Sequence, residues 1–500
     1  MRVVIVGAGI GGLTLALSLH AAGIEAVVYE AAPEILPLGV GINILPHAVR
    51  ELTDLGLADR LADNAIATEA LMYANRFGQE IWREPRGRHA GYNWPQYSIH
   101  RGVLQQLLFN AVRERLGKGA VHLDHEATGV ETGSDGATVS FRSKATGAAL
   151  ASAQGDVVVA ADGIHSALRA QFYPGEGPPI WNRRVLWRGV TESAPFLGGA
   201  TMVMAGHQDM KFVCYPIDPK AAGRGTSTIN WIAELRFPDT VEWRQEDWNR
   251  KGELADFLPR FESWDFGWLD VPEIIRGSGQ VYEYPLVDRN PVDRWTFGRT
   301  TLMGDAAHPM YPIGSNGASQ AVLDARSLAY DLATQPTIEA ALAAYEDARR
   351  PATSRIVLSN RGNGPEQVMQ MAEERAPEGF AHVHDVISRE ELEATAGEYK
   401  TLAGFDREAP NSRASLVVGQ VRASPKAWTD AVDIAMLIVT PSMSSGHRIF
   451  TGRLQGWNAS PGERRQPVYG VSLTIAGGVS FADPLCRTAW DQAGVSVRVT

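Results

Sequence analysis

The sequence predicts an α/β fold in which a parallel sheet wound with helices is combined with a second, mainly antiparallel sheet. Two observations support this prediction. At the N-terminus a β-branched strand runs through a glycine-rich turn into a helix pattern and a second strand, all within residues 2–30. Between residues 201 and 237, in contrast, apolar and polar residues alternate over short runs such as TMVMAG and STINWIAELRF, which favours antiparallel strands.

Length, charge and cysteine content narrow the class of protein. A chain of 500 residues is too long for one small core and suggests two or three domains, and its net charge of −10 argues against general nucleic-acid binding. Cys214 and Cys486 lie far apart and offer neither a disulfide framework nor a metal-ligand spacing. Residues 1–23 look like a secretory signal, but glycines interrupt them, and the chain has no unbroken apolar run of the roughly 20 residues that span a membrane. We expect a cytoplasmic protein with no metal, nucleic-acid or membrane partner.

The first element is the strand RVVIV (2–6), followed by the turn GAGIGG and a helix pattern that closes at Gly23. In such a unit Gly7 permits the tight turn, Gly9 lets a pyrophosphate approach the backbone, and Gly12 lets helix and strand pack closely. Taken alone, these glycines fit a turn in any α/β protein. The flanking strands favour a dinucleotide site.

The second strand, EAVVYE, ends at Glu30. A carboxylate at this offset from the glycine turn can accept hydrogen bonds from a ribose 2′-hydroxyl, and it repels a 2′-phosphate. Glu30 therefore predicts FAD or NAD(H) as the ligand, and argues against NADP(H) in this site.

Two later segments carry further candidates for the same ligand. QYSIHRGVLQQLLFNAV (96–112) places Arg101 just before an amphipathic helix, where a guanidinium can pair with a phosphate, although a surface arginine is the simpler interpretation. GDVVVAADGIHSALR (155–169) is a strand that runs into Asp162 and Gly163, a dipeptide that is also common in turns.

The segment GDAAHPMYPIGSNGASQA (304–321) follows an apolar run and leads into a helix pattern. A strand that ends here places the Asp305 carboxylate at the crevice where open α/β sheets bind ligands, so that it can accept hydrogen bonds from polyol hydroxyls. Gly314 and Gly317 bring backbone N–H groups and a helix N-terminus toward the same ligand. Ligand contacts at both Glu30 and Asp305 require an extended cofactor, which favours FAD over NAD. The alternative is that Asp305 only caps the following turn.

GAGIGG with Glu30, HR at 100–101, ADG at 161–163 and GDAAHP at 304–309 together resemble the single-component FAD-dependent aromatic hydroxylases, which include 4-hydroxybenzoate and salicylate hydroxylases. The resemblance covers roughly residues 1–415. LWRGVT (186–191) and KFVCYPI (211–217) are most similar to the subgroup of phenazine-modifying monooxygenases.

The resemblance implies a cofactor-contacting role for residues spread along the chain. They are Gly7, Gly9 and Gly12 at the FAD pyrophosphate, Glu30 and Ala31 at the adenosine ribose, Gly41 and Ile42 with their backbone alongside the cofactor, Arg101 between ribityl chain and phosphates, Asp162 and Gly163 at FAD and the passing nicotinamide, Asp305 at the ribityl chain, and Gly314, Asn316 and Gly317 at the isoalloxazine edge.

The family's fold interleaves two domains, and this organisation is expected here. The FAD-binding domain would comprise 1–70, 97–178 and 286–335, and the substrate domain 71–96 and 179–285. Residues 336–418 would form a C-terminal helical region. The tail at 419–500 does not fit this plan, and we expect it to be disordered or a poorly packed appendage.

The resemblance also implies the chemistry. NADH or NADPH would reduce FAD transiently, and a flavin C4a-hydroperoxide formed with O2 would hydroxylate a small aromatic or N-heteroaromatic substrate, with or without decarboxylation. Pro312 stands where relatives offer a backbone carbonyl to the substrate or the hydroperoxide. The protein would act as a monomer or homodimer.

Ring activation or substrate orientation would need a base or a cation near the ring, and four residues are candidates, namely Arg188, His207, Tyr215 and Tyr311. Arg188 can pair with a substrate carboxylate, but a structural salt bridge is an equal alternative. For His207 a surface position is the simpler interpretation, and for Tyr215 a packed core position. Other polar or aromatic residues are expected to be structural, namely His308 in its loop and Trp94, Trp187, Trp231 and Cys214 in the core.

Three rival functions remain at this stage. An NAD-dependent dehydrogenase would leave the Asp305 loop without a role. A flavin halogenase would need a W-x-W-x-I-P stretch, which YNWPQY (92–97) does not match. A non-hydroxylating FAD oxidoreductase or redox-sensing flavoprotein fits the same cofactor motifs, and only an aromatic-stimulated oxidation of NADH would separate it from a hydroxylase.

Overall fold

The computed structural model describes residues 1–37, 39–241, 250–362, 366–402, 408–416, 435–444, 447–457 and 467–476. The chain divides into two compact units, Met1–Gln420 and Val421–Thr500. Among the helices of these ranges, none is long and apolar enough to cross a membrane. The main helices are α1 (Ile10–Ala21), α2 (Pro46–Asp54), α3 (Ala58–Ala62), α4 (Arg101–Leu116), α5 (Ala167–Phe172), α6 (Leu254–Phe257), α7 (Val271–Arg276), α8 (Gly317–Thr334), α9 (Ile338–Asn360), α10 (Gln367–Arg375), α11 (Arg389–Leu402) and α12 (Glu408–Ser412).

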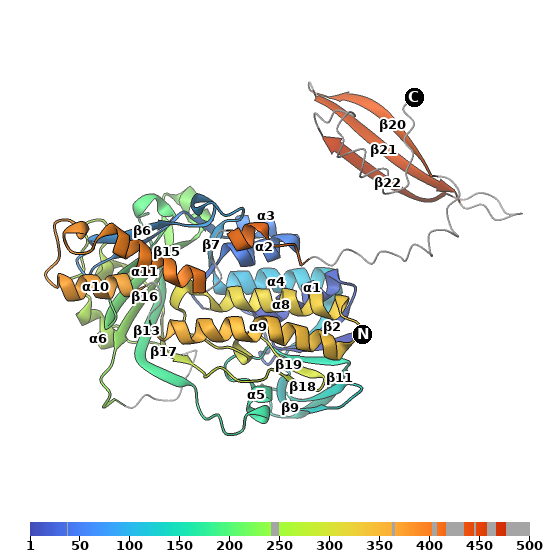
Figure 1. The fold of residues 1–500 in the computed structure, drawn as a ribbon, viewed down its shortest axis with the longest axis horizontal. Helices are drawn as coiled ribbons and strands as arrows, with labels where there is room; N and C mark the ends of the chain where they lie inside the picture. Colours follow the sequence, from blue (N-terminus) through green and yellow to red (C-terminus); the bar gives the residue numbers. More distant parts are fainter. Residues whose placement is uncertain are drawn as a thin grey trace, which may run out of the picture. The chain divides into compact units, whose positions relative to one another are not determined.

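A six-stranded sheet carries the N-terminal motif. Its order is β18-β19-β12-β1-β2-β8, and all pairs are parallel except β18 with β19. The strands are β1 (Arg2–Val6), β2 (Glu25–Tyr29), β8 (Val121–His122), β12 (Val157–Ala160), β18 (Thr296–Phe297) and β19 (Thr300–Leu302). The central strands are runs of valine and other apolar residues that are buried on both faces, as expected for a parallel sheet. Helix α1 packs against both α4 and α8 beside this sheet (Figure 1).

A seven-stranded sheet is the second large sheet of the same unit (Figure 1). Its order is β17-β13-β16-β15-β14-β5-β6. The strands are β5 (Ala70–Ala74), β6 (Glu80–Pro85), β13 (Ile180–Ser193), β14 (Thr201–His207), β15 (Met210–Asp218), β16 (Ser227–Arg236) and β17 (Val281–Asp288). The predicted antiparallel pairing is present except between β14 and β5, which run parallel. Parallel pairing is possible here because the two strands belong to separate segments and are not joined by a hairpin.

The two faces of the seven-stranded sheet differ because successive side chains of a strand point to opposite sides. Val203, Cys214 and Trp231 contribute to an aromatic core that includes residues of α6 and α7. Met204 and Tyr215 lie on the opposite face, where residues of α10 pack against them. This second face also carries charged residues of the sheet, among them Arg188 and Lys211.

Two smaller antiparallel sheets complete the first unit. One joins β3 (Gly41–Ile44), β7 (Gln96–His100) and β4 (Ile66–Thr68), and the other joins β11 (Ala149–Gly155), β10 (Ala137–Arg142) and β9 (Glu126–Thr132). The helices expected from 337 to about 400 correspond to α9, α10 and α11. The domain boundaries proposed from the sequence stay a prediction.

The second unit is described by three strands alone. They are β20 (Ala435–Ser444), β21 (His447–Trp457) and β22 (Pro467–Ala476), and they pair in antiparallel order β20-β21-β22. The rest of the predicted tail at 419–500 lies outside the described residues.

Candidate functional site

The glycines of the first turn fall into two classes by what surrounds them. Gly7 has φ +105°, and a Cβ there would lie 2.3 Å from the Ala161 carbonyl oxygen. A Cβ on Gly12 would lie 2.0 Å from the Gly7 carbonyl oxygen. A Cβ on Gly9, in contrast, would meet no atom of the described chain within 4 Å. Close packing explains why glycine is needed at positions 7 and 12. Gly9, in contrast, faces open space at the start of α1, which leaves room for a pyrophosphate to approach the backbone.

Glu30 follows β2 and organises the glycine turn. Its Oε2 accepts a hydrogen bond of 2.6 Å from the Ala8 N–H, and its Oε1 accepts one of 2.8 Å from the Ala32 N–H. Ala31 lies between Glu30 and Ala32, which this second hydrogen bond joins. The carboxylate stays partly exposed, and each oxygen has a further lone pair that a ribose hydroxyl can use.

Asp162 and Gly163 follow β12 at the neighbouring strand end. Asp162 Oδ2 accepts a hydrogen bond of 3.0 Å from the Ala167 N–H, while its Oδ1 is buried and has no partner among the residues that the structure describes. Burial raises the pKa of Asp162 to about 6. Gly163 has φ +80°, and a Cβ there would meet nothing within 4 Å. An acceptor oxygen without a donor beside an open glycine fits a site for a hydroxyl-bearing ligand.

Asp305 follows β19 in the short helical turn η6 (Gly304–Ala306). Its side chain is exposed, and it accepts no hydrogen bond from the described part of the chain. The pKa of its carboxyl is nevertheless raised by the desolvating atoms around it, while His308 and Arg101 oppose the rise. The two findings are compatible, because a side chain can touch solvent while protein atoms still surround its carboxyl group. Asp305 therefore does not act as the turn cap considered above.

The N-terminus of α8 lies next to this carboxylate. A Cβ on Gly317 would be 4.0 Å from Asp305 Oδ1. Gly314 adopts φ +69° within η7 (Ile313–Ser315), and Asn316 is buried directly before the helix. The open backbone N–H groups of a helix start favour electron-rich ligand atoms.

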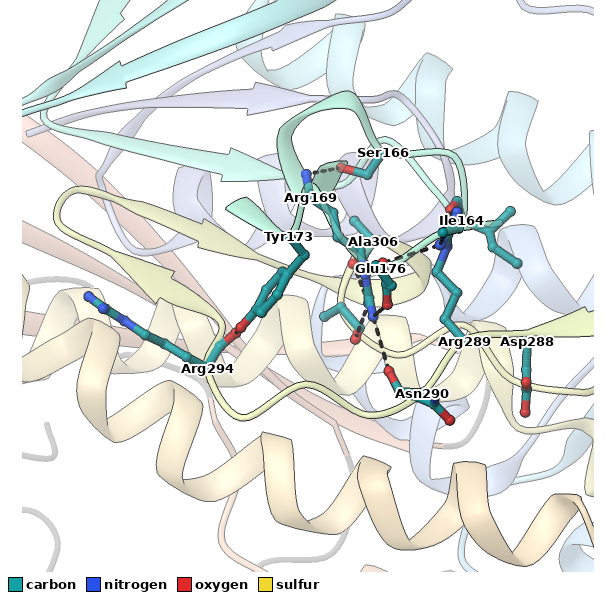
Figure 2. Close-up of polar contacts among 12 residues, drawn as sticks. Ile164, Ser166, Arg169, Tyr173, Glu176, Asp288, Arg289, Asn290, Arg294 and Ala306 are labelled. Carbon is teal, nitrogen blue, oxygen red and sulfur yellow. Dashed lines mark hydrogen bonds and ion pairs between the residues drawn. The ribbon is translucent and has the colours of Figure 1, made fainter. Parts of the chain in front are cut away.

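Arg169 joins the Asp162 loop to the Asp305 loop, and the sequence interpretation did not single it out. Its side chain is 1% exposed and donates hydrogen bonds of 2.9 and 2.8 Å to the carbonyls of Ala306 and Ala307 (Figure 2). It also forms an ion pair of 2.5 Å with Glu176. Arg169 therefore fixes the spacing of the two acidic loops. The sequence shows an arginine seven positions after Asp162. Its role could not be predicted from that position, because its partners Ala306 and Ala307 lie far along the chain.

β3 and the start of α4 carry the remaining predicted cofactor residues. The Gly41 N–H donates a hydrogen bond of 2.6 Å to Asn230 Oδ1, and a Cβ on Gly41 would lie 2.6 Å from the Asn230 Cβ. Ile42 pairs with Ile99 of β7. Arg101 is the first residue of α4 and is exposed. Its charge acts on the pKa of both Asp305 and Arg188, so it lies near both groups.

Four of the five predicted substrate-side residues, namely Arg188, Tyr215, Tyr311 and Pro312, lie in one neighbourhood. Arg188 donates a hydrogen bond of 2.8 Å to the Gly41 carbonyl, and its charge lies close enough to Tyr215 to oppose the rise in the pKa of that hydroxyl. Pro312 is exposed, and the residues on either side of it, Tyr311 and Ile313, pack in one cluster with Leu186 of β13. Asn360 holds this loop by donating a hydrogen bond of 2.9 Å to the Tyr311 carbonyl.

The structure does not bring His207 to this group. His207 lies at the β14–β15 hairpin, where its Nδ1 accepts a hydrogen bond of 3.4 Å from the Asp209 N–H. Its partner Met210 stands five residues before Tyr215, a separation of about 17 Å along a strand. Strand alternation also places His207 on the opposite face of the sheet from Tyr215.

The residues expected to be structural have structural surroundings. His308 Nε2 lies 2.5 Å from Asp324 Oδ2, and Arg349 holds the other oxygen of Asp324 at 2.7 Å. Although burial alone would raise the pKa of Asp324, His308 and Arg349 lower it to about 2. Trp187, Trp231 and Cys214 are buried in the aromatic core, and Trp94 lies under the guanidinium of Arg50.

Comparisons with known proteins agree with this geometry. The model of the FAD binding domain family matches residues 1–196 and 275–359. A phenazine 1,6-dicarboxylic acid hydroxylase, PhzS, from Lysobacter antibioticus is 47% identical over 375 residues, which cover 72% of this chain and 89% of the relative. The chain belongs to the FAD-dependent aromatic hydroxylases. This hydroxylase is also 35% identical to a 3-amino-4-hydroxybenzoate 2-monooxygenase from Streptomyces platensis over 73% of this chain and 88% of the relative.

Solved structures share the fold of this hydroxylase. HpxO from Klebsiella pneumoniae, complexed with FAD and uric acid, has a TM-score of 0.63 at 24% identity and covers 81% of this chain and 96% of its own. A salicylate hydroxylase substrate complex has a TM-score of 0.63 at 20% identity, covering 85% of this chain and 99% of its own.

Proposed function

We propose that this hydroxylase binds FAD between the glycine turn and the loops of Asp162 and Asp305, and hydroxylates an aromatic or N-heteroaromatic ring beside Arg188, Tyr215 and Pro312. The observation that carries the proposal is the 47% identity, over 72% of the chain, to a relative named for hydroxylation of a phenazine. A tricyclic N-heteroaromatic ring is therefore the first substrate to test.

The predicted cofactor residues differ in the part of FAD that each would contact. The backbone at Gly9 and the start of α1 would hold the pyrophosphate, and Arg101 at the start of α4 would supply a positive charge. Asp162 Oδ1 and the Asp305 carboxylate would accept hydrogen bonds from ligand hydroxyls, since both lack a donor in the described chain. The N-terminus of α8 would face the ring edge, where it favours negative charge. When bound, FAD supplies the redox and oxygen chemistry.

The substrate-side residues orient the ring and hold its protons. Pro312 would offer its backbone carbonyl as an acceptor at the surface of the site. Burial raises the pKa of Tyr215 to about 12, although Arg188 opposes the rise. Tyr215 is therefore protonated at neutral pH and serves as a hydrogen-bonding group, whereas the sequence had left open a role as a base.

The electron donor is NADH or NADPH, and we propose that it binds transiently over the groove beside Asp162 and Gly163. The sequence has no second glycine fingerprint with a following strand and acidic residue, so the donor has no separate Rossmann site of its own. We further infer that O2 is the co-substrate, that the protein acts in the cytoplasm, and that it is a monomer or homodimer.

The test is a screen of aromatic acids and N-heteroaromatic compounds with the purified, yellow protein. We expect one non-covalent FAD per chain, oxidation of NADH stimulated by a matching ring, and a product heavier by one oxygen atom. A net loss of carbon dioxide with gain of oxygen would identify decarboxylation. Stimulated oxidation of NADH that yields only hydrogen peroxide with every ring tested would contradict hydroxylation. Release of FMN on heating would contradict the cofactor assignment.

A further inference from the structure

The loop that carries Pro312 contains an unfavourable turn. Pro312 is exposed between the buried side chains of Tyr311 and Ile313, and its carbonyl accepts a hydrogen bond of 3.2 Å from the Ser315 N–H. Ser315 has φ +57°, in the left-handed region that residues with a side chain rarely adopt. Such a turn persists only where its surroundings hold it. The groups that hold this loop therefore also fix the Pro312 carbonyl, which keeps a second lone pair for a ligand.

Asn360, the last residue of α9, holds the main chain of the loop. Its side chain is fully buried, and its amide nitrogen donates a hydrogen bond of 2.9 Å to the Tyr311 carbonyl. This carbonyl belongs to the peptide bond between Tyr311 and Pro312, in which the proline supplies no N–H. The Tyr311 oxygen is thus the hydrogen-bonding group of that peptide, and Asn360 determines how the peptide that enters Pro312 is oriented.

Arg361, the next residue, secures the surroundings of the Tyr311 side chain. The Tyr311 hydroxyl donates a hydrogen bond of 3.4 Å to the Ile180 carbonyl, and Ile180 pairs with Asp288 at the end of β17. Arg361 donates hydrogen bonds of 2.7 and 3.0 Å to the two carboxylate oxygens of Asp288, which is fully buried. Burial and the nearby charge of Asp288 raise the pKa of Tyr311. Because a buried carboxylate needs a charged partner, Arg361 keeps this end of the loop in place.

Arg361 also contacts the segment that leads to the Asp162 loop. Its Nη1 donates a hydrogen bond of 3.0 Å to Asn290 Oδ1, and the Asn290 carbonyl accepts one of 3.1 Å from Arg169 (Figure 2). Arg169 lies in α5, shortly after the Asp162 loop. The two loops are therefore tied to one segment by separate groups. Loss of Arg361 should loosen the Pro312 loop and leave the Arg169 contacts in place.

We propose that Asn360 and Arg361 are positioning residues for the hydroxylation, and that they set the fraction of oxidised NADH that yields hydroxylated ring instead of hydrogen peroxide. The inference rests on the proposed function. In the productive reaction, NADH, one proton and O2 yield NAD⁺, water and a ring in which one C–H has become C–OH. In the unproductive reaction, the same NADH, proton and O2 yield NAD⁺ and hydrogen peroxide, and the ring is unchanged.

The productive reaction depends on the place of the ring. Oxygen transfer needs aligned atoms, and a displacement of about 1 Å can slow such a step about a hundredfold. A ring held against a Pro312 carbonyl that is free to move loses this alignment. Binding and oxidation of NADH, which we place beside Asp162, do not need it. A loosened loop should therefore lower the product formed per NADH much more than the rate of NADH oxidation.

The test measures NADH consumed, hydroxylated product and hydrogen peroxide for the FAD-loaded wild type and its variants. The ring is phenazine 1,6-dicarboxylic acid, the compound in the name of the relative, or another ring that the wild type hydroxylates in the screen above. Asn360→Leu removes the donor at similar size, and Arg361→Gln removes the charge that holds Asp288. We expect each to lower product per NADH at least about threefold, with NADH oxidation within about twofold of the wild-type rate. Arg361→Lys retains the charge and should keep part of the wild-type ratio.

A second measurement needs no turnover. The ring is titrated into the oxidised, FAD-loaded protein, and the change in flavin absorption at saturation reports how the ring lies against the flavin. We expect Asn360→Leu and Arg361→Gln to alter the shape of this difference spectrum. The matched control is Arg355→Gln, which removes a positive charge from an exposed position of the same helix. It should change neither the spectrum nor the product per NADH.

An unchanged product per NADH in both variants would overturn the positioning role. An equal fall of NADH oxidation and product would also overturn it, because it would indicate a purely structural role. The same loss of product per NADH in Arg355→Gln would overturn it as well. If Asn360→Leu does not fold, Arg361→Gln and Arg361→Lys decide, because Arg361 follows the end of the helix and is only half-buried.

The result is separable from the proposed function. A wild type that hydroxylates rings, with product per NADH unchanged in both variants, would keep the hydroxylase and overturn the roles of Asn360 and Arg361. A wild type that binds rings but forms no hydroxylated product would contradict the proposed function. In that protein, a difference spectrum altered by Asn360→Leu and not by Arg355→Gln would still support the positioning of the ring.

Discussion

The two ends of the proposed cofactor site use their carboxylates in opposite ways. At the β1–β2 end, Glu30 accepts hydrogen bonds from the N–H groups of Ala8 and Ala32, so the carboxylate is part of the turn that it shapes. At the β12–β19 end, Asp162 keeps one buried oxygen without a donor, and Asp305 has no hydrogen bond in the described chain. Both carboxylate oxygens at the first end therefore have hydrogen-bond donors without a ligand. At the second end, oxygens of Asp162 and Asp305 lack donors among the described residues.

Carboxylates at two ends of one site can therefore be required for unlike reasons. Substitution of Glu30 should damage the folded protein as well as cofactor binding. Substitution of Asp305 should weaken cofactor binding and spare the folded protein. Melting temperature of the apoprotein and dissociation constant of FAD, measured together, separate the two cases.

The largest contrast lies within the glycine turn itself. Gly12→Ala places a Cβ 2.0 Å from the Gly7 carbonyl oxygen, so we expect loss of folded protein, at a cost of roughly 4 kcal/mol or more. Gly9→Ala meets no atom of the described chain, and the apoprotein should melt as the wild type does while FAD binds at least about tenfold more weakly. Normal FAD binding by Gly9→Ala would show that the pyrophosphate lies elsewhere.

Glu30→Ala tests the completed end. It removes the acceptor of two short hydrogen bonds from backbone N–H groups, and we expect destabilisation of about 2–4 kcal/mol, which is seen as a melting temperature several degrees lower in the apoprotein. FAD affinity should also fall. If apoprotein stability were unchanged, the distinction between the two ends would fail.

Asp305→Ala tests the open end. The lost interaction is a charge-assisted hydrogen bond to the ligand, worth about 1.5–3 kcal/mol, so FAD dissociation should rise about ten- to a hundredfold. The apoprotein should melt at the wild-type temperature, because Asp305 accepts no hydrogen bond from the described residues. A lower melting temperature with unchanged FAD affinity would restore the cap interpretation.

Asp162→Asn should change the stability of the apoprotein in a way that depends on pH. Burial raises the pKa of Asp162 from 3.8 to about 6, so the folded apoprotein favours the protonated acid. The stability associated with that acid is fully present below pH 3.8 and is lost as pH rises through about 6. Asparagine cannot ionise, so the melting temperature of Asp162→Asn should gain on the wild type over this range. If the melting temperatures of the two apoproteins changed with pH in parallel, the raised pKa of Asp162 would be wrong.

The features that could be predicted from sequence are those whose causes are local. The glycine turn and the strands around it lie within thirty residues, and steric limits on Gly7 and Gly12 act on adjacent backbone. The FAD motifs could likewise be found one by one, because each combines a strand end with a fixed residue type. Arg169 was missed because its acceptors, the carbonyls of Ala306 and Ala307, are recognised by position in space and not by residue type.

The α/β class, the cofactor family and the strand ends at which acidic residues stand follow from the sequence. Two further facts follow only from the folded structure. Among the residues that it describes, Arg188 forms no ion pair with a carboxylate while Lys211 forms two, and His207 lies away from Tyr215. The physical reason is that ion pairing depends on which strands become neighbours, in which register and on which face. Strand alternation fixes the face only once the register is known, and register is set by contacts between segments far apart in the chain.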